Sequence, residues 1–251
     1  MNRTNLIRPV TVIGLPFAGA TQYSYNPLKE FFPEEIKFFC IDIPGRGSRI
    51  TEPLLTDILQ ITDDVFRQIR QHLNPPYAFF GHSMGTLLAY LLTHRILKEG
   101  MRPPQHLFLS GRSGPSVPCN TKDYLLPKEE FRARLMELGG VPDQILSNES
   151  AMSLFEPILR ADFQAVEEYK HRILPILSVP ITVMIGKDEE TSMSEALIWQ
   201  KETSQSVAVH EFDGDHFFIF NHRPGIVDII VKSLGAVPLS VNHQDIFMKR
   251  S

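Results

Sequence analysis

The pentapeptide Gly-His-Ser-Met-Gly at positions 81–85 restricts the fold of this chain more than any other part of its sequence. An apolar run at 77–80 predicts a buried strand before it, and the pattern at 86–97 predicts a helix after it. A strand that turns into a helix within so few residues holds the serine in a strained backbone conformation, and the flanking glycines give neighbouring backbone room to pass. We therefore expect Ser83 to project from the C-terminal edge of a sheet, beside the positive end of a helix.

Apolar runs and helical patterns alternate along most of the chain. The predicted strands lie at 10–15, 36–43, 77–81, 106–110, 181–185 and 207–212, and the predicted helices at 59–72, 84–98, 192–203 and 225–234. Several runs are apolar at consecutive positions, as in strands that helices cover on both faces. Together with the pentapeptide, this alternation predicts an α/β-hydrolase fold, in which one domain over 1–251 holds a mostly parallel, doubly wound sheet.

One connection is too long for an ordinary crossover between strands. Residues 115–179 carry no convincing strand, and their pattern predicts helices near 128–138, 149–159 and 162–174. We interpret this segment as a helical insertion that forms a lid over an acyl pocket. The alternative is a helical elaboration packed on the side of the sheet.

Composition excludes several classes of protein. The chain is 43% hydrophobic and 22% charged, and its formal net charge of -4 gives no sign of a nucleic-acid site. Cys40 and Cys119 form no Cys-x-x-Cys pair, so neither a zinc site nor a disulfide framework is predicted. No apolar stretch approaches the roughly 20 residues that span a bilayer, and residues 1–8 do not resemble a signal peptide. We expect a cytoplasmic protein and, by default, a monomer.

A serine hydroxyl is a weak nucleophile until a base takes its proton. In this fold an acid and then a histidine follow the serine along the chain. His216 is the predicted base, because it lies in the loop after the last predicted strand. His222 is its rival, whereas His82 should point away from Ser83 and His210 lies inside a strand.

The acid should end a late strand and reach the other nitrogen of the histidine. Asp188 fits, because it completes the turn Gly186-Lys187-Asp188 after the predicted strand at 181–185. Glu189 and Glu190 are adjacent carboxylates in the same turn.

Acyl transfer also needs donors for the negative oxygen that develops on the substrate carbonyl. One is the backbone N–H of Met84, directly after the nucleophile. The loop after the first strand, with the sequence Pro-Phe-Ala-Gly at 16–19, provides the second through the backbone N–H of Phe17.

Six segments resemble a known family and occur in its order across residues 10–235. They are Pro-Phe-Ala-Gly at 16–19, Asp-Ile-Pro-Gly-Arg-Gly-Ser-Arg at 42–49, the pentapeptide at 81–85, Leu-Arg-Ala-Asp-Phe at 159–163, Gly-Lys-Asp at 186–188 and Gly-Asp-His-Phe-Phe at 214–218. The family is that of the type II, stand-alone thioesterases that accompany polyketide and nonribosomal peptide synthetases. The segments at 42–49 and 159–163 are far more specific to it than the pentapeptide is.

The resemblance implies a triad of Ser83, Asp188 and His216, a mobile lid and no cofactor. It implies as substrate an acyl thioester on the phosphopantetheine arm of a carrier protein, and as role the removal of wrong or stalled acyl groups. Arg46 and Arg49 are then candidate exposed residues for carrier contact. The chain departs from the family by carrying Gly-Asp-His, with Asp215, where members often have Gly-Gly-His.

Two other functions stay open at this level. One is a general esterase, lactonase or acyltransferase that acts on free small molecules. The other is a binding protein with a hydrolase fold and no catalysis, although such proteins usually lack one of the triad residues.

Overall fold

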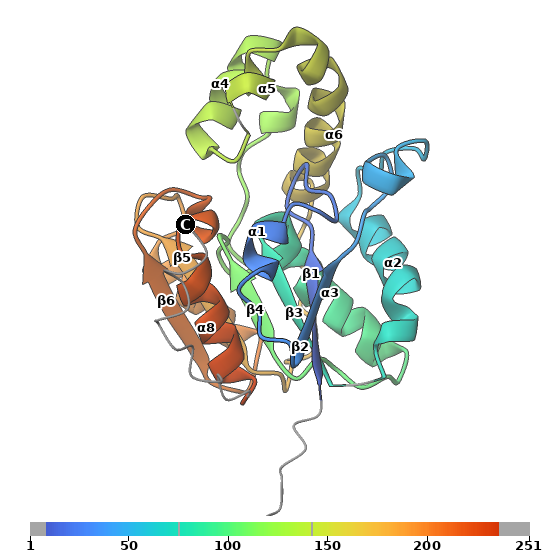
Figure 1. Cartoon of the computed structure of the whole chain (residues 1–251), viewed down its shortest axis with the longest axis vertical. Helices are drawn as coiled ribbons and strands as arrows, with labels where there is room; N and C mark the ends of the chain where they lie inside the picture. Colours follow the sequence, from blue (N-terminus) through green and yellow to red (C-terminus); the bar gives the residue numbers. More distant parts are fainter. Residues whose placement is uncertain (1–8, 75, 142, 236–251) are drawn as a thin grey trace, which may run out of the picture.

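The computed structural model describes residues 9–74, 76–141 and 143–235, so the predicted absence of a signal peptide at 1–8 lies outside the described residues. All six predicted strands form and join in one sheet of order β2-β1-β3-β4-β5-β6 (Figure 1). The strands are β1 (Val10–Leu15), β2 (Ile36–Cys40), β3 (Tyr77–His82), β4 (Leu107–Ser110), β5 (Ile181–Gly186) and β6 (Val207–Phe212). Every neighbouring pair is parallel, as the predicted α/β-hydrolase fold requires.

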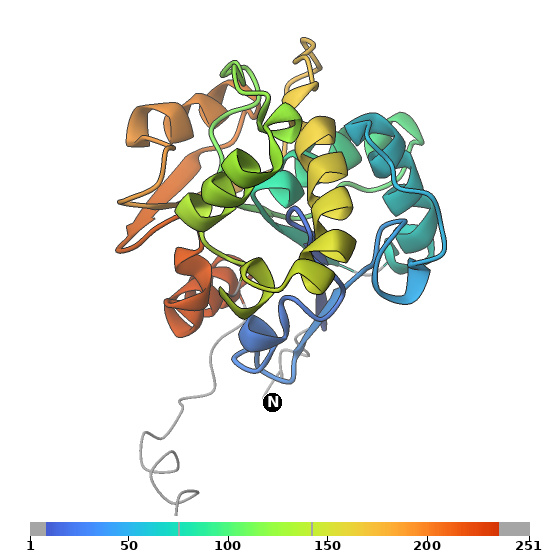
Figure 2. The same ribbon diagram turned by 90° about the horizontal axis from the view of Figure 1, so that it is seen from above.

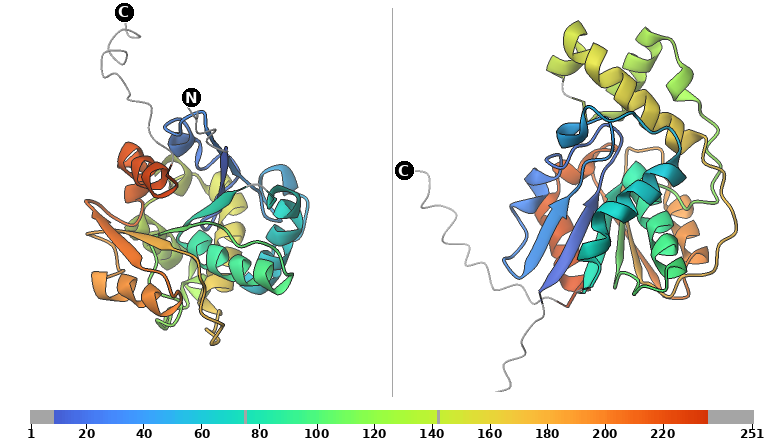
Figure 3. Two further views of the ribbon diagram at one scale, coloured as in Figure 1. Left: turned by 90° about the horizontal axis from the view of Figure 1, so that it is seen from below. Right: turned by 90° about the vertical axis from the view of Figure 1, so that its right-hand side faces the viewer.

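Helices cover both faces of the sheet (Figure 3). They include α1 (Asn26–Lys29), α2 (Ile58–Ile69), α3 (Met84–Lys98), α7 (Met193–Ala196) and α8 (Arg223–Ser233), with short 3₁₀ turns at Gly47–Arg49, Arg70–His72, Leu197–Lys201 and Phe218–Phe220. Ile13 and Phe79 face α2 and α3 in one apolar core, whereas Val12 and Phe80 face α8 in the other. Consecutive strand residues therefore enter opposite cores, which explains why the strands are apolar at consecutive positions.

The insertion lies between β4 and β5 and contains the 3₁₀ turn η3 (Asp123–Leu125) and the helices α4 (Lys128–Leu138), α5 (Asp143–Leu146) and α6 (Glu149–Glu167). These helices lie across one end of the sheet, as the view from above shows (Figure 2). Their own small core centres on Phe131, Leu135 and Met152. Because this core is separate from the two that flank the sheet, the insertion forms a distinct layer over the strand ends.

Three predicted helices differ from those observed. The patterns at 149–159 and 162–174 form one helix, α6, which continues through Pro157 and ends at Glu167. The prediction begins a new helix at 162, whereas the carboxylate of Asp162 forms a buried ion pair in the middle of α6. The predicted helix at 192–203 is only one α-helical turn, α7, followed by a 3₁₀ segment.

None of the helices within the described ranges combines the length and the apolar character that a membrane crossing requires.

Candidate active site

The turn from β3 into α3 holds Ser83 in a strained conformation. Its φ of 54° is the only positive value at a non-glycine residue among the described residues. A Cβ on Gly81 would lie 2.1 Å from the carbonyl oxygen of Gly85, and one on Gly85 would lie 2.4 Å from that of Leu15. Both flanking glycines are therefore required by close backbone contact, and Ser83 stands directly before the N-terminus of α3.

The two predicted oxyanion donors have free N–H groups. Met84 is the first residue of α3, where no intrahelical acceptor exists. Phe17 begins a turn closed by a 2.9 Å hydrogen bond from the N–H of Ala20 to the carbonyl of Phe17. Within the described residues, neither the Phe17 nor the Met84 N–H donates a hydrogen bond, so both donors are available to a ligand.

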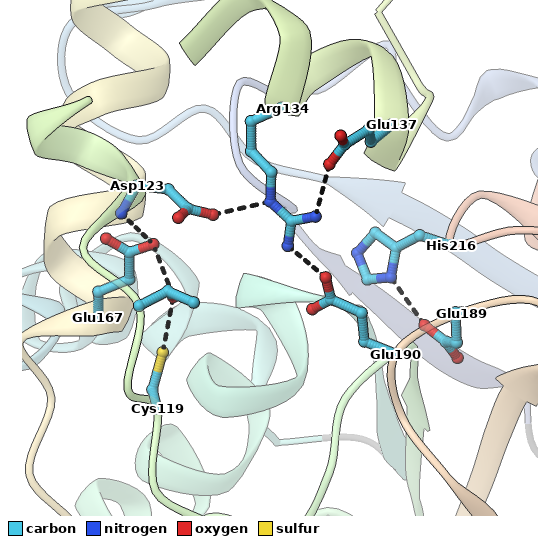
Figure 4. Close-up of polar contacts among 9 residues, drawn as sticks. Cys119, Asp123, Arg134, Glu137, Glu167, Glu189, Glu190 and His216 are labelled. Atoms are coloured by element: carbon cyan, nitrogen blue, oxygen red, sulfur yellow. Dashed lines mark hydrogen bonds and ion pairs between the residues drawn. The ribbon is translucent and has the colours of Figure 1, made fainter. Parts of the chain in front are cut away.

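A carboxylate lies behind the imidazole of His216. Nδ1 of His216 is 2.7 Å from Oε2 of Glu189, whose side chain is 1% exposed (Figure 4). The second oxygen of Glu189, Oε1, accepts a 2.8 Å hydrogen bond from the backbone N–H of Gly186, at the end of β5. This carboxylate is thus fixed at both oxygens and orients the ring.

The sequence prediction placed Asp188 behind His216, and the structure places Glu189 there. The side chain of Asp188 is exposed and makes no hydrogen bond to His216, while its N–H donates to the carbonyl of Gly214 at 3.0 Å. The turn after β5 folds back so that the third residue after Gly186 caps the strand end. A carboxylate at that spacing from the strand's last residue was the feature in the sequence that could have identified Glu189.

The other histidines do not compete for the role of base. His82 is fully buried and bonds Ser110 Oγ at 3.1 Å through Nδ1, and burial lowers its pKa well below the ordinary value. Its ring centroid lies 4.7 Å from that of His216, so a neutral His82 packs beneath the base. His222, the sequence rival, is bound through Nε2 to the carbonyl of Asp213 at 2.7 Å. His210 lies in β6, as predicted.

Ser83 and His216 border two cavities. One, of about 270 Å³, is mainly apolar and is lined by the Phe17 loop, by Phe217 and by α4 and α6 residues including Leu135, Phe155 and Leu159. The other, of about 470 Å³, is rich in polar groups and extends past Arg112, Asn120 and Thr121. No hydrogen bond joins Ser83 Oγ to His216 among the described residues, and such bonds often tighten only when substrate is bound.

An ion-pair cluster ties the insertion to the loop that carries Glu189. Arg134 of α4 donates through Nε to Asp123 at 2.8 Å, and through Nη2 to Glu190 at 2.5 Å (Figure 4). A third contact reaches Glu137 on the same helix at 3.4 Å. The position of α4 is therefore linked to the residue next to Glu189.

The expectation that Arg46 and Arg49 are exposed is wrong. Arg46 is 2% exposed and paired with Asp162. Arg49 donates to Asp64 at 2.5 Å and to Glu52 at 2.7 Å, and these hydrogen bonds raise its pKa further above the usual arginine range. Both guanidinium groups are therefore paired with carboxylates of the same chain.

A parallel sheet with a strained serine between β3 and α3 places the chain in the α/β-hydrolase class. Residues 10–234 match the family model of the thioesterase domain. The chain belongs to the thioesterase family and is a thioester hydrolase.

Curated relatives and solved structures agree with this assignment. The gramicidin S biosynthesis protein GrsT of Aneurinibacillus migulanus is 36% identical over 225 residues, which make up 89% of this chain and 88% of that protein. The human medium-chain S-acyl fatty acid synthase thioesterase is 32% identical and covers 91% of this chain and 89% of its own. The type II thioesterase BorB from the borrelidin biosynthetic cluster superimposes with a TM-score of 0.83 at 32% identity, over 90% of this chain and 92% of that one.

Proposed function

We propose that this thioesterase hydrolyses acyl groups from the phosphopantetheine arm of carrier proteins that serve a polyketide or nonribosomal peptide synthetase. The observation that carries the proposal is the meeting of an apolar and a polar cavity at Ser83 and His216. A thioester carbonyl at Ser83 then has its acyl chain in the first cavity and its arm in the second. The relatives named for gramicidin S and borrelidin biosynthesis support a role beside a synthetase.

In the proposed mechanism, His216 takes the proton of Ser83, whose oxygen attacks the thioester carbonyl. The backbone N–H groups of Phe17 and Met84 bind the oxyanion, and His216 protonates the departing thiol. Water, activated by the same imidazole, then hydrolyses the acyl-serine ester. Glu189 fixes the tautomer of His216 and stabilises its charged form. Every step uses groups of this chain and water, so the scheme requires no cofactor.

The polar cavity offers N–H donors for oxygens of the arm at Arg112 and Asn120, although most of its charged lining residues are carboxylates. The side chain of Arg112 lines it and makes no hydrogen bond or ion pair with any residue in the described part of the chain. Burial lowers the pKa of this guanidinium, which indicates a partly desolvated cation. An arm oxygen that accepts its N–H donors would compensate that desolvation.

The proposed lid is the insertion of α4, α5 and α6, and the entire chain acts as one catalytic domain. Arg134 and the α6 residues that line the apolar cavity connect this lid to the site. The proposed working form is a monomer in the cytoplasm, where carrier proteins are loaded.

Comparison of a carrier protein loaded with a butyryl group and the p-nitrophenyl ester of butyrate tests the substrate. We expect kcat/KM to be higher for the loaded carrier by at least about tenfold, because only the carrier substrate fills the polar cavity. Release of free acid is followed by mass spectrometry. A clear preference for the simple ester would instead support a small-molecule esterase.

The apolar cavity limits the length of the acyl chain. Its volume of about 270 Å³ is near the lower end of small-molecule pockets, and Phe155 lines it. Phe155→Ala enlarges it, and we expect the ratio of kcat/KM for a decanoyl over a butyryl thioester to rise by about tenfold. Leu154→Ala is the matched control, since Leu154 precedes Phe155 on α6 and is 75% exposed. An unchanged ratio in Phe155→Ala would place the acyl chain elsewhere.

A further inference from the structure

Two sequence motifs that the proposed mechanism does not use meet in one buried ion pair. Arg46, in the loop after β2, donates through Nη2 to Oδ1 of Asp162 on α6 at 2.7 Å, and through Nη1 to Oδ2. The side chains are 2% and 0% exposed. These residues lie in the segments at 42–49 and 159–163. They are 116 positions apart along the chain and form one bidentate contact.

The same carboxylate holds the loop that carries Phe17. Oδ2 of Asp162 accepts a 2.7 Å hydrogen bond from the backbone N–H of Gly19. Gly19 lies inside the turn from Phe17 to Ala20, with a φ of 78°, and a Cβ there would lie 2.7 Å from Leu159 Cδ2. The turn is therefore packed directly against α6, with Asp162 binding its backbone.

Fold stability alone is a weak explanation for this arrangement. A buried ion pair often contributes no more than well-packed apolar residues of the same volume, because both charges lose their hydration. Arg46 also leaves its buried Nε without a hydrogen-bond partner among the described atoms. An apolar pair would avoid that penalty, but it could not bind the N–H of Gly19.

We propose that Asp162, held in place by Arg46, is a positioning residue that fixes the Phe17 loop in the geometry needed for oxyanion binding. This inference rests on the proposed function, in which the N–H of Phe17 is an oxyanion donor. Because Asp162 belongs to α6, the oxyanion site is complete only when this helix of the insertion is docked on the sheet. Docking of α6 on the sheet then also positions the Phe17 N–H for oxyanion binding.

Asp162→Asn tests the proposal. An NH₂ group at the Oδ2 position would face both the Gly19 N–H and Nη1 of Arg46, and one at the Oδ1 position would face Nη2 of Arg46. In either orientation the bidentate pair that holds the anchor of the Phe17 loop is broken. We expect kcat to fall by about 10- to 100-fold, part of the 10²–10³ that loss of an oxyanion donor costs, with KM within about threefold. The pH profile of kcat/KM should keep its wild-type midpoint, because the pair of His216 and Glu189 is untouched.

Asp64→Asn is the matched control. It breaks the ion pair of Arg49, which belongs to the same loop as Arg46 but does not contact Gly19. We expect its kcat to stay within about twofold of wild type, because Arg49 keeps its ion pair with Glu52 and neither Asp64 nor Arg49 contacts Gly19. Equal losses in Asp64→Asn and Asp162→Asn would overturn the proposal, because any disturbance of the 42–49 loop would then suffice.

The double variant Arg46→Met/Asp162→Leu separates positioning from folding. This variant leaves no unpaired buried charge, so we expect its thermal unfolding midpoint to stay near that of wild type. It also leaves the Gly19 N–H without an acceptor. A folded double variant with low kcat supports the proposal, and one with wild-type kcat overturns it. All variants are assayed on both the p-nitrophenyl ester and the loaded carrier. Wild-type failure on the carrier alone would refute the proposed substrate and leave this test intact on the ester.

Discussion

Ser83→Ala is expected to lower kcat on an acyl-loaded carrier by about 10³- to 10⁶-fold, because it removes the oxygen that forms the acyl-enzyme in the turn after β3. Residual turnover would come from substrate binding and from the free N–H groups of Phe17 and Met84 acting on water. The acid released per unit time, measured by mass spectrometry, gives the rate. Because chemistry is then slow relative to substrate dissociation, KM approaches the Kd of the loaded carrier, and a binding titration checks this value.

Ser83→Thr serves as a companion variant that retains a hydroxyl. Its extra methyl group meets the crowded turn at φ 54°, where β-branched residues are disfavoured, so we expect it to be nearly as inactive. Thermal unfolding of both variants checks that the turn still forms. Turnover of a folded Ser83→Ala within tenfold of wild type would refute the proposed nucleophile.

Glu189→Gln is expected to lower kcat by about 10³- to 10⁴-fold, comparable to the loss of the acid in other Ser-His-acid enzymes. The glutamine can still accept the Gly186 N–H through its oxygen, but its NH₂ group then faces Nδ1 of His216. Nδ1 becomes the acceptor, so the proton moves to Nε2 and the imidazole cannot take the proton of Ser83. Steady-state kinetics on the loaded carrier measure the effect.

Asp188→Asn is the control for Glu189→Gln, one residue away in the same turn. Its side chain is exposed and does not contact His216, so we expect kcat within about threefold of wild type. The sequence and the family resemblance assign the larger loss to position 188, whereas the structure assigns it to 189. The opposite order of effects would restore Asp188 as the acid.

The sequence was sufficient for features that depend on local periodicity or on a short motif. Six strands, the turn at Ser83, the loop of His216 and the helix at Lys128–Leu138 follow from patterns within about 15 residues. The choice between Asp188 and Glu189 depends instead on how a turn folds back over the end of β5. A shift of one position along that turn decides which carboxylate reaches the imidazole, and the hydropathy pattern does not reveal this position.

Contacts between distant segments were also outside the reach of local patterns. The predicted helix at 162–174 begins at Asp162, and a carboxylate buried inside a helix is unfavourable without a partner. The partner, Arg46, belongs to a loop that looked solvent-exposed. Only the fold brings the two together. Because Arg46 pairs with Asp162, the carboxylate is tolerated in the middle of α6.

The most direct test of the account is to label the protein with a fluorophosphonate probe and locate the adduct by peptide mass spectrometry. We predict one adduct per chain, on Ser83, and a labelling rate that falls by several orders of magnitude in His216→Ala while the protein stays folded. An adduct on another residue, or an unchanged rate in His216→Ala, would contradict the claim that His216 makes Ser83 the nucleophile.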